Sequence, residues 1–389
     1  MDSTMFFSTV RPLALECASE FIGTFVLVFL GTAGIAAAAF TVPGGVNLAL
    51  EQVAVGWGVA AALATFIGSP GSGAHLNPAV TLAIAISPHA NNSFPKCKIP
   101  AYMLFQLLGA TLAGLTVYLM FGSAIVRYEQ RLDLSRGSAS SSLSAVAFGA
   151  SFPHPQLVYK YAVGEDSSFW SKNDVSVAGA VFLEALGTTL FVLVQRIIRQ
   201  PHQPAGVAAF TNLAAGAQDI KEILPPRMPA TPLAPLYVGA ALAALTMVMT
   251  PFTQACLNPA RDFGPRVVAA IAGWGSVALP GERADCVWVY VMGPLIGGVA
   301  GSLLFDFAIY PGLQTRDEAA AAWMRRQQME GEAILEQLEK SHTLLSVTGG
   351  GGGFESLATR GLHHSDFRDS PTPHNFRLSS PSHLHTYAA

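Results

Sequence analysis

The chain has 389 residues, of which 51% are hydrophobic and only 12% are charged, and its mean hydropathy is +0.41. Soluble domains carry roughly 25% charged residues, so this composition indicates a protein that lies largely in a membrane. The net charge of −3 gives no basis for binding nucleic acid, and we expect no nucleic-acid partner.

Several stretches of the chain are apolar over the length needed to cross a bilayer, which is about 20 residues. The six predicted spans are Leu13–Phe40, Leu48–Gly68, Ile99–Gly122, Val177–Ile198, Leu233–Phe252 and Cys286–Tyr310. No small-residue cleavage site follows the first of them. The sequence therefore predicts an uncleaved membrane helix there rather than a signal peptide.

A short polar signature, AxLNPA, occurs twice, as Ala74–Ala79 and as Ala255–Ala260. Asn is a favourable helix N-cap, and Pro fits the first helical turn, where no amide hydrogen is missed. Each copy therefore predicts the start of a helix too short to span the bilayer, over Asn77–Ser87 and over Asn258–Ala272. Two such broken helices, one in each half of the chain, are typical of a pore or a transport site.

The two halves of the hydrophobic region, about residues 13–122 and 177–312, resemble each other. Glu20–Thr24 in the first span matches Glu184–Thr188 in the fourth, since both begin with Glu and end with Gly-Thr. Because each half contains an odd number of spans, the second half must be inverted relative to the first. The predicted fold is an all-α membrane protein with six transmembrane helices and two half-helices in an inverted repeat.

Positive charges in short loops predict the orientation, because such charges stay on the cytoplasmic side. Lys96 follows the first half-helix, and Arg196 and Arg199 end the fourth span, whereas residues 41–47 after the first span carry no positive charge. We therefore expect a multi-pass protein of the plasma membrane with both termini in the cytoplasm. The glycosylation sequon at Asn91 would then lie inside the cell and stay unmodified.

The two half-helix starts give the centre of the membrane a particular electrostatic character. A helix N-terminus carries partial positive charge and unpaired amide hydrogens, so two of them together repel cations and protons but admit neutral molecules. The side-chain amides of Asn77 and Asn258 are expected to donate hydrogen bonds to a passing hydroxyl group or water. Arg261 follows the second motif directly, and a charge at membrane depth usually faces a pore. Asp262 and Arg266 are spaced to pair on one helix face.

With their flanking residues, the two motifs resemble the pore motifs of the major intrinsic protein family, the aquaporins and aquaglyceroporins. Ser72–Thr81 is similar to the first motif and Asn258–Arg266 to the second. The resemblance covers roughly residues 13–312. It implies a homotetramer in the lipid bilayer with one pore in each subunit, and passive transport without catalysis or a cofactor.

The same resemblance implies which residues line the narrowest part of the pore. In the family, an Arg at the position of Arg261 presents donors to the solute and adds a barrier to cations. The pattern also places Thr246 and Ala255 on the pore wall. Water-selective members usually have a His at the position of Thr246, so Thr and Ala imply a wider filter here.

Further matches favour the glycerol-facilitator branch of the family. Asp262 after the filter Arg, and Arg266 four residues on, are similar to the pattern of glycerol facilitators. Trp57 stands where these facilitators place a Trp and would form an aromatic wall opposite the Arg. The unusual spacing of Gly68–Gly71 leaves Val55 as an alternative at this position, with Trp57 then serving only in packing. Where such facilitators usually carry another aromatic residue, this chain has Ala255, which leaves the preferred solute open.

Four other residues near the motifs have two interpretations each. Glu20 and Glu184 could couple transport to protons, although the resemblance implies that they accept hydrogen bonds from the backbone leading into the half-helices. His75 is expected to be a hydrogen-bonded pore residue on the cytoplasmic side, with a proton relay or gate as the alternative. Cys256 lies near the pore, either as a reactive thiol or as a buried, inert one.

Outside the repeats, the sequence predicts loops and a tail. Residues 1–312 form the predicted aquaporin-like channel domain and 313–389 a cytoplasmic tail, with a short helix over about 314–342 and disorder beyond it. Residues 123–176 are expected to form a long loop. The segment 201–231 is expected to be a surface insertion, with a cap over the cytoplasmic mouth as the alternative.

The predicted function is a passive channel for small uncharged solutes, with glycerol foremost and with water and urea as further solutes, that excludes protons and ions. The sequence predicts no enzyme activity and no cofactor. Neither the scattered cysteines nor the tail histidines predict a metal site. The alternatives are a water-dominated channel, a proton-coupled secondary transporter, and a membrane-junction or scaffolding protein that depends on its tail.

Overall fold

The computed structural model describes residues 3–41, 50–87, 94–159, 170–199, 233–283 and 286–313, and isolated helical positions between 326 and 340. The chain separates into two compact units, Met1–Met324 and Arg325–Ala389. All regular structure in the described part of the first unit is helical. In the second unit, Glu336 and Lys340 form an exposed ion pair one helical turn apart. The predictions for the sequon at Asn91, for residues 201–231 and for tail disorder fall outside the described residues.

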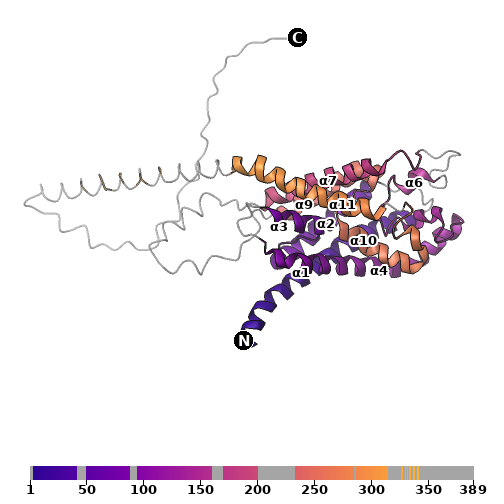
Figure 1. The fold of residues 1–389 in the computed structure, drawn as a ribbon, viewed down its shortest axis with the longest axis horizontal. Helices are drawn as coiled ribbons and strands as arrows, with labels where there is room; N and C mark the ends of the chain where they lie inside the picture. The colour runs from indigo at the N-terminus through magenta and orange to yellow at the C-terminus, as the bar shows by residue number, and fades with distance from the viewer. Residues whose placement is uncertain are drawn as a thin grey trace, which may run out of the picture. The chain divides into compact units, whose positions relative to one another are not determined.

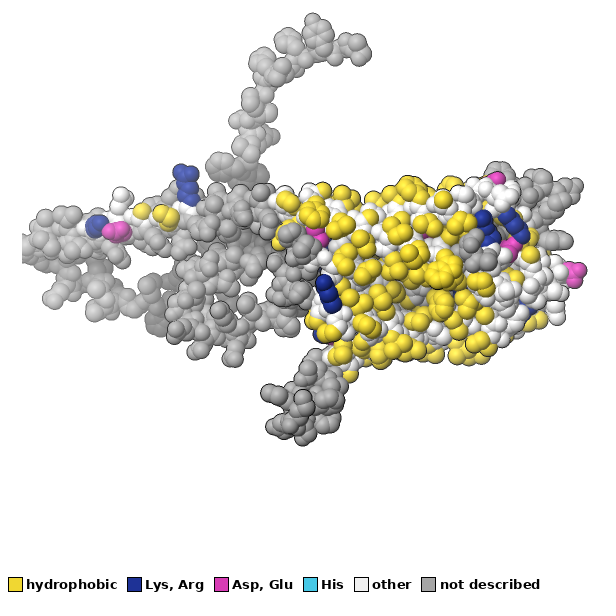
Figure 2. All heavy atoms as spheres, in the orientation of Figure 1, with side chains coloured by type: hydrophobic (Ala, Val, Ile, Leu, Met, Phe, Trp, Pro, Cys, Tyr) yellow, Lys and Arg dark blue, Asp and Glu magenta, His cyan; other side chains and the backbone are white. Residues whose placement is uncertain are grey.

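Six helices have the length and the apolar composition of membrane spans, so the predicted number of spans is confirmed. They are α1 (Ser3–Phe40), α2 (Leu50–Ser72), α4 (Ile99–Arg131), α7 (Val177–Ile198), α9 (Ala234–Thr253) and α11 (Cys286–Leu304). Large apolar side chains point outward from them; Leu119 is 73% exposed and Phe66 is 70% exposed. Figure 2 shows these side chains as a broad hydrophobic band, with most of the visible charged groups toward its ends. Such a surface requires a lipid environment.

Two shorter helices, α3 (Pro78–Ile86) and α10 (Pro259–Ala269), begin at the two NPA motifs. The side chains of Asn77 and Asn258 accept hydrogen bonds from amides of the first turn, so the predicted N-caps are confirmed. The second half-helix ends earlier than predicted. Its last residues form the π-helical turn η5 (Ala270–Trp274), in which Gly273 has the positive φ of 107°.

The packing of the helices follows the inverted repeat. In the first half α1 contacts α2 and α4, and in the second half α7 contacts α9 and α11 in the same way. Figure 1 shows α1 and α4 running side by side. Each half-helix packs against the last span of the opposite half, α3 against α11 and α10 against α4. This exchange holds the two halves together and places both half-helices within one bundle.

Glycines allow the closest helix crossings. Where α2 crosses α9, a Cβ on Gly58 would lie 2.8 Å from the carbonyl oxygen of Gly239. Where α7 crosses α11, a Cβ on Gly297 would overlap the carbonyl oxygen of Ala185 and lie 2.8 Å from the Cβ of Thr188. The backbones can approach this closely only because no side chain lies between them.

We expect the substitution Gly297→Ala to lower the free energy of unfolding by about 1–3 kcal/mol, because α7 and α11 must separate to accept the methyl group. The drop in Tm during thermal unfolding in detergent micelles measures this effect. Gly122→Ala is the matched control, since a Cβ on Gly122 meets nothing within 4 Å. Equal melting temperatures for the two variants would contradict a tight α7–α11 crossing.

The predicted end of the third span at Gly122 and the predicted loop over residues 123–176 are both wrong in part. Helix α4 continues past Gly122 to Arg131 because its apolar face stays covered: Ile125 is fully buried, and the rings of Tyr128 and Phe40 are 5.2 Å apart. Part of the expected loop is also helical. It contains the turn η2 (Ala139–Ser141) and the short helices α5 (Ser142–Ala145) and α6 (Pro155–Val158).

His154 is the N-cap of α6. Its Nδ1 accepts a hydrogen bond from the amide of Gln156 at 3.2 Å, and the side chain is buried. Burial lowers the pKa of His154 to about 4. The folded protein therefore keeps this ring neutral at a pH where the unfolded chain, with a pKa of about 6.5, already binds a proton.

Acidification should therefore destabilise the protein through His154. The stability that the neutral ring contributes is complete above about pH 6.5 and is lost as the pH falls toward 4, with a loss of about 2 kcal/mol at pH 5. The substitution His154→Asn keeps a capping oxygen but cannot titrate, so it should reduce the difference in Tm between pH 7.5 and pH 5. Identical pH dependence in both proteins would show that His154 is not the group responsible.

Candidate functional site

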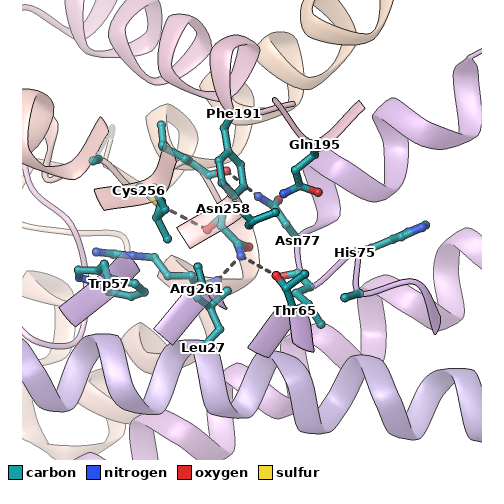
Figure 3. A pocket seen from close by; sticks show the side chains of 17 residues that line it. Leu27, Trp57, Thr65, His75, Asn77, Phe191, Gln195, Cys256, Asn258 and Arg261 are labelled. Carbon is teal, nitrogen blue, oxygen red and sulfur yellow. Dashed lines mark hydrogen bonds between the residues drawn. The ribbon is translucent and has the colours of Figure 1, made fainter. Parts of the chain in front are cut away.

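A cavity lies between the spans at the N-termini of α3 and α10, and residues of α1, α2, α7 and α9 complete its wall. Asn77 and Asn258 both line this cavity. Figure 3 shows Trp57 and Arg261 together on one side of this pair and His75 on the other. We refer to these as the Arg261 end and the His75 end of the cavity.

The two Asn side chains join the half-helices to each other. Nδ2 of Asn77 donates to the carbonyl oxygen of Leu257 at 2.8 Å, and Nδ2 of Asn258 donates to the carbonyl oxygen of Leu76, also at 2.8 Å. Each side-chain amide has two hydrogens, and within the described structure neither nitrogen has a second acceptor. One donor on each Asn is therefore available to a molecule in the cavity.

Glu20 and Glu184 hold the backbone that leads into the half-helices. Glu20 accepts hydrogen bonds from the amides of His75 and Leu76 at 2.9 and 2.7 Å. Glu184 accepts the corresponding pair from the second segment at 3.0 and 2.7 Å. Both carboxylates are fully buried, and neither lines the cavity. Their contacts fit structural support better than proton coupling.

Trp57 and Arg261 are in contact at one end of the cavity. The guanidinium carbon of Arg261 lies 4.6 Å from the centroid of the Trp57 ring, and both residues line the cavity. The ring packs where Gly31 has no side chain. The alternative residue, Val55, is 56% exposed on the outer surface. At this distance Trp57 lies against Arg261, so the ring does not form the aromatic wall opposite the Arg that the sequence predicted.

The other two predicted filter residues differ in their positions. Ala255 lines the cavity, with a backbone φ of 47°. Thr246 is 2% exposed and lies on the same face of α9 as Val238 and Leu242, which do line the cavity. Thr246 itself is not among the lining residues. It lies one helical turn beyond Leu242, outside the outline of the cavity.

Asp262 and Arg266 form the ion pair that their spacing predicts, with 2.6 Å between Oδ2 and Nε. The pair also holds the segment after α4. Asp262 Oδ1 accepts the amide hydrogen of Ala150 at 2.8 Å, and Arg266 donates to the carbonyl oxygens of Ala150 and Ala278. A second carboxylate contact, 3.9 Å to Arg261, links the pair to the cavity.

His75 lines the far end of the cavity and is held from several sides. Its Nδ1 lies 3.2 Å from Oγ1 of Thr81, and its ring contacts the rings of Phe94 and Tyr102 at 4.9 and 5.1 Å. Cys256 occupies the matching place in the second motif. Its buried thiol lines the cavity and donates to the carbonyl oxygen two residues on.

Sequence reasoning missed several wall residues. They are Leu27 of α1, Ala61 and Thr65 of α2, Phe191 and Gln195 of α7, and Val238 and Leu242 of α9. Gln195 could have indicated the cavity-facing side of α7, because it is a polar residue near the end of an otherwise apolar span. Phe191, four residues earlier, lies on the same helix face.

Comparisons with known proteins agree with this architecture. The family model described as major intrinsic protein matches residues 8–218 and 221–305. A glycerol uptake facilitator protein of Haemophilus influenzae is 32% identical over 300 residues, which cover 77% of this chain and 95% of the relative. The propanediol uptake facilitator PduF of Citrobacter freundii is 30% identical over 298 residues, which cover 76% and 93%.

A solved structure gives independent support for the fold. The aquaglyceroporin from Plasmodium falciparum superposes with a TM-score of 0.57 at 24% identity, and the match covers 78% of this chain and 99% of that one. Together with the six apolar helices, the matches identify a multi-pass integral membrane protein. The chain belongs to the major intrinsic protein family.

Proposed function

We propose that this protein is a passive channel for small uncharged solutes, chiefly glycerol, which also passes water and urea. The observation that carries the proposal is the mixed wall of the cavity. Donors of Asn77, Asn258 and Arg261 line the same cavity as apolar side chains such as Leu27 and Leu242. This combination suits a solute that has a carbon backbone and hydroxyl groups. Relatives named glycerol uptake facilitators, up to 32% identical over three quarters of the chain, support the same solute.

The channel is further proposed to exclude protons and ions, since two half-helix N-termini and Arg261 give its interior a positive potential. Positive charges in the short loops support cytoplasmic termini. The family relationship supports a homotetramer in the plasma membrane, built from residues 1–312 with 313–389 as a cytoplasmic tail.

Liposomes that contain the purified protein test the proposal. In an inward glycerol gradient the vesicles should shrink and then re-swell at a rate that an imposed pH gradient leaves unchanged. Shrinkage without glycerol entry would instead identify a water-dominated channel. Uphill solute movement driven by the pH gradient would identify a proton-coupled transporter. Faster entry of 1,2-propanediol than of glycerol would instead indicate propanediol as the main solute, as the name of the Citrobacter freundii relative suggests.

The proposed filter makes a prediction of its own. Thr246→His should narrow the passage and lower glycerol flux by about tenfold or more, a barrier increase of about 1.4 kcal/mol, while water flux falls less. Thr246→Ser is the matched control and should leave both rates unchanged. Stopped-flow light scattering measures both fluxes in the same vesicles. Equal loss of water and glycerol flux in Thr246→His would show that Thr246 does not face the solute path.

A further inference from the structure

A second arginine stands at the His75 end of the cavity. Arg199 is the C-cap residue of α7. Its Nη1 donates to the carbonyl oxygen of Gly73 at 2.7 Å, and its Nη2 donates to the carbonyl oxygen of Ala74 at 2.9 Å and to Oε1 of Gln195 at 3.1 Å. Ala74 and Gln195 line the cavity. The guanidinium is therefore fixed at the boundary of the cavity, on the side away from Arg261.

Local structure explains why this position holds a cation. The C-terminus of a helix carries partial negative charge, which favours a guanidinium there. The three acceptors match the planar fork of Arg, whereas the ammonium of a Lys is a compact point charge without that fork. In the described part of the chain, Arg199 forms no ion pair with a carboxylate. Glu20 attracts it at longer range, but the Glu20 oxygens are occupied by backbone amides.

The repeat shows that this arrangement belongs to one end of the cavity alone. Gln254 and Ala255 correspond to Gly73 and Ala74 in the inverted repeat, and all four have positive φ angles. Among the described residues, nothing donates a hydrogen bond to the backbone carbonyl oxygens of Gln254 and Ala255. Ala255 lines the cavity, so its carbonyl oxygen stays available to a solute at the Arg261 end, whereas Arg199 occupies the counterpart on Ala74 at the His75 end.

We propose that Arg199 is a specificity-determining residue of the pore, a second cationic barrier at the end opposite Arg261. It repels small cations there, and it withholds the carbonyl oxygens of Gly73 and Ala74, which would otherwise stabilise a cation. Neutral solutes pass because they carry no charge. The proposal rests on the proposed channel function and adds a residue to its selectivity.

The test must account for two barriers in series. A cation that meets both arginines is limited by the higher barrier, so removing Arg199 alone leaves Arg261 in control. Liposomes should therefore carry Arg261→Val combined either with Arg199→Gln or with Arg199→Lys. We expect methylammonium to leak at least about tenfold faster through the Gln variant than through the Lys variant, because only Lys keeps the charge. Glycerol and water flux should agree between the two within about twofold.

Arg127→Gln, in the Arg261→Val background, is the matched control, because Arg127 is exposed and, within the described residues, bonds only to a carbonyl of its own helix. It should leave the leak unchanged. Equal leaks in the Gln and Lys variants would overturn the proposal. A parallel fall of water, glycerol and cation flux in both variants would also overturn it, because that result would assign Arg199 a purely structural role. The leak pattern can hold even if the unmodified channel admits no glycerol, so the two proposals fail separately.

A second variant covers the case in which Arg199→Gln does not fold. Arg199→Met, again with Arg261→Val, keeps a long unbranched side chain and removes the charge. Its cation leak is compared with that of Arg261→Val alone and should be at least about tenfold faster. A leak no faster than that of Arg261→Val alone would contradict a barrier made by charge.

Discussion

Replacing Asp262 with asparagine should lower the free energy of unfolding by about 3–5 kcal/mol, because it leaves a buried guanidinium without its counter-charge. The side chains of Asp262 and Arg266 are each 3% exposed. The two oxygens of Asp262 accept hydrogen bonds from Nε of Arg266 and from the amide of Ala150. An Asn has only one acceptor oxygen, so its NH2 group would face one of these two donors. Solute flux should fall with the folded fraction, since the same contacts hold α10 and Arg261.

A double-mutant cycle separates the ion pair from its surroundings. Asp262→Asn combined with Arg266→Gln should cost less than the sum of the single changes, by about 1–3 kcal/mol. Glu16→Gln is the comparison, because Glu16 pairs with Lys98 at 2.8 Å but the two side chains are 20% and 26% exposed. That change should cost less than about 1 kcal/mol. Similar losses of Tm for Asp262→Asn and Glu16→Gln would contradict the role given to burial.

Glu184→Gln should destabilise the segment before α10 by about 2–4 kcal/mol. The two carboxylate oxygens of Glu184 accept the buried amide hydrogens of Cys256 and Leu257, whereas glutamine has only one acceptor oxygen. Water and glycerol flux should fall together, by about tenfold or more, since the displaced segment forms the wall for both solutes. Glu20→Gln should have the same effect through the other half of the repeat. Vesicle shrinkage and re-swelling measure both rates.

This experiment also distinguishes the channel from a proton-coupled transporter. In a transporter, a neutral side chain at Glu184 would abolish the response to a pH gradient and leave passive exchange intact. If the protein is a channel, Glu184→Gln lowers the passive flux, and the flux depends on a pH gradient in neither the variant nor the unmodified protein. Glu51→Gln, at an exposed position in the first turn of α2, should change neither rate. Retained passive flux in Glu184→Gln would contradict the supporting role of this carboxylate.

Local features of the chain determined the elements of this fold. The length of each apolar run sets a membrane span, and an Asn followed by Pro sets the start of a half-helix, because both effects act within a few residues. The repeat of Glu20 at Glu184 and of Asn77 at Asn258, together with the odd number of spans in each half, was enough to predict inversion. The end of α4 was missed, since Ile125 and Tyr128 are covered by residues distant in sequence.

Only the tertiary structure decided which faces of the helices turn toward the cavity. In a membrane protein, lipid and core both accept apolar side chains, so hydropathy does not encode the rotation of a span. Trp57 rather than Val55 turns inward because Gly31 leaves room for the ring. Arg199 became part of the cavity boundary through carbonyl groups of Gly73 and Ala74, far away in sequence. The sequence by itself determined the helices, their caps and the inverted repeat. The tertiary structure decided which residues line the cavity, because that depends on how closely the backbones of distant segments approach one another.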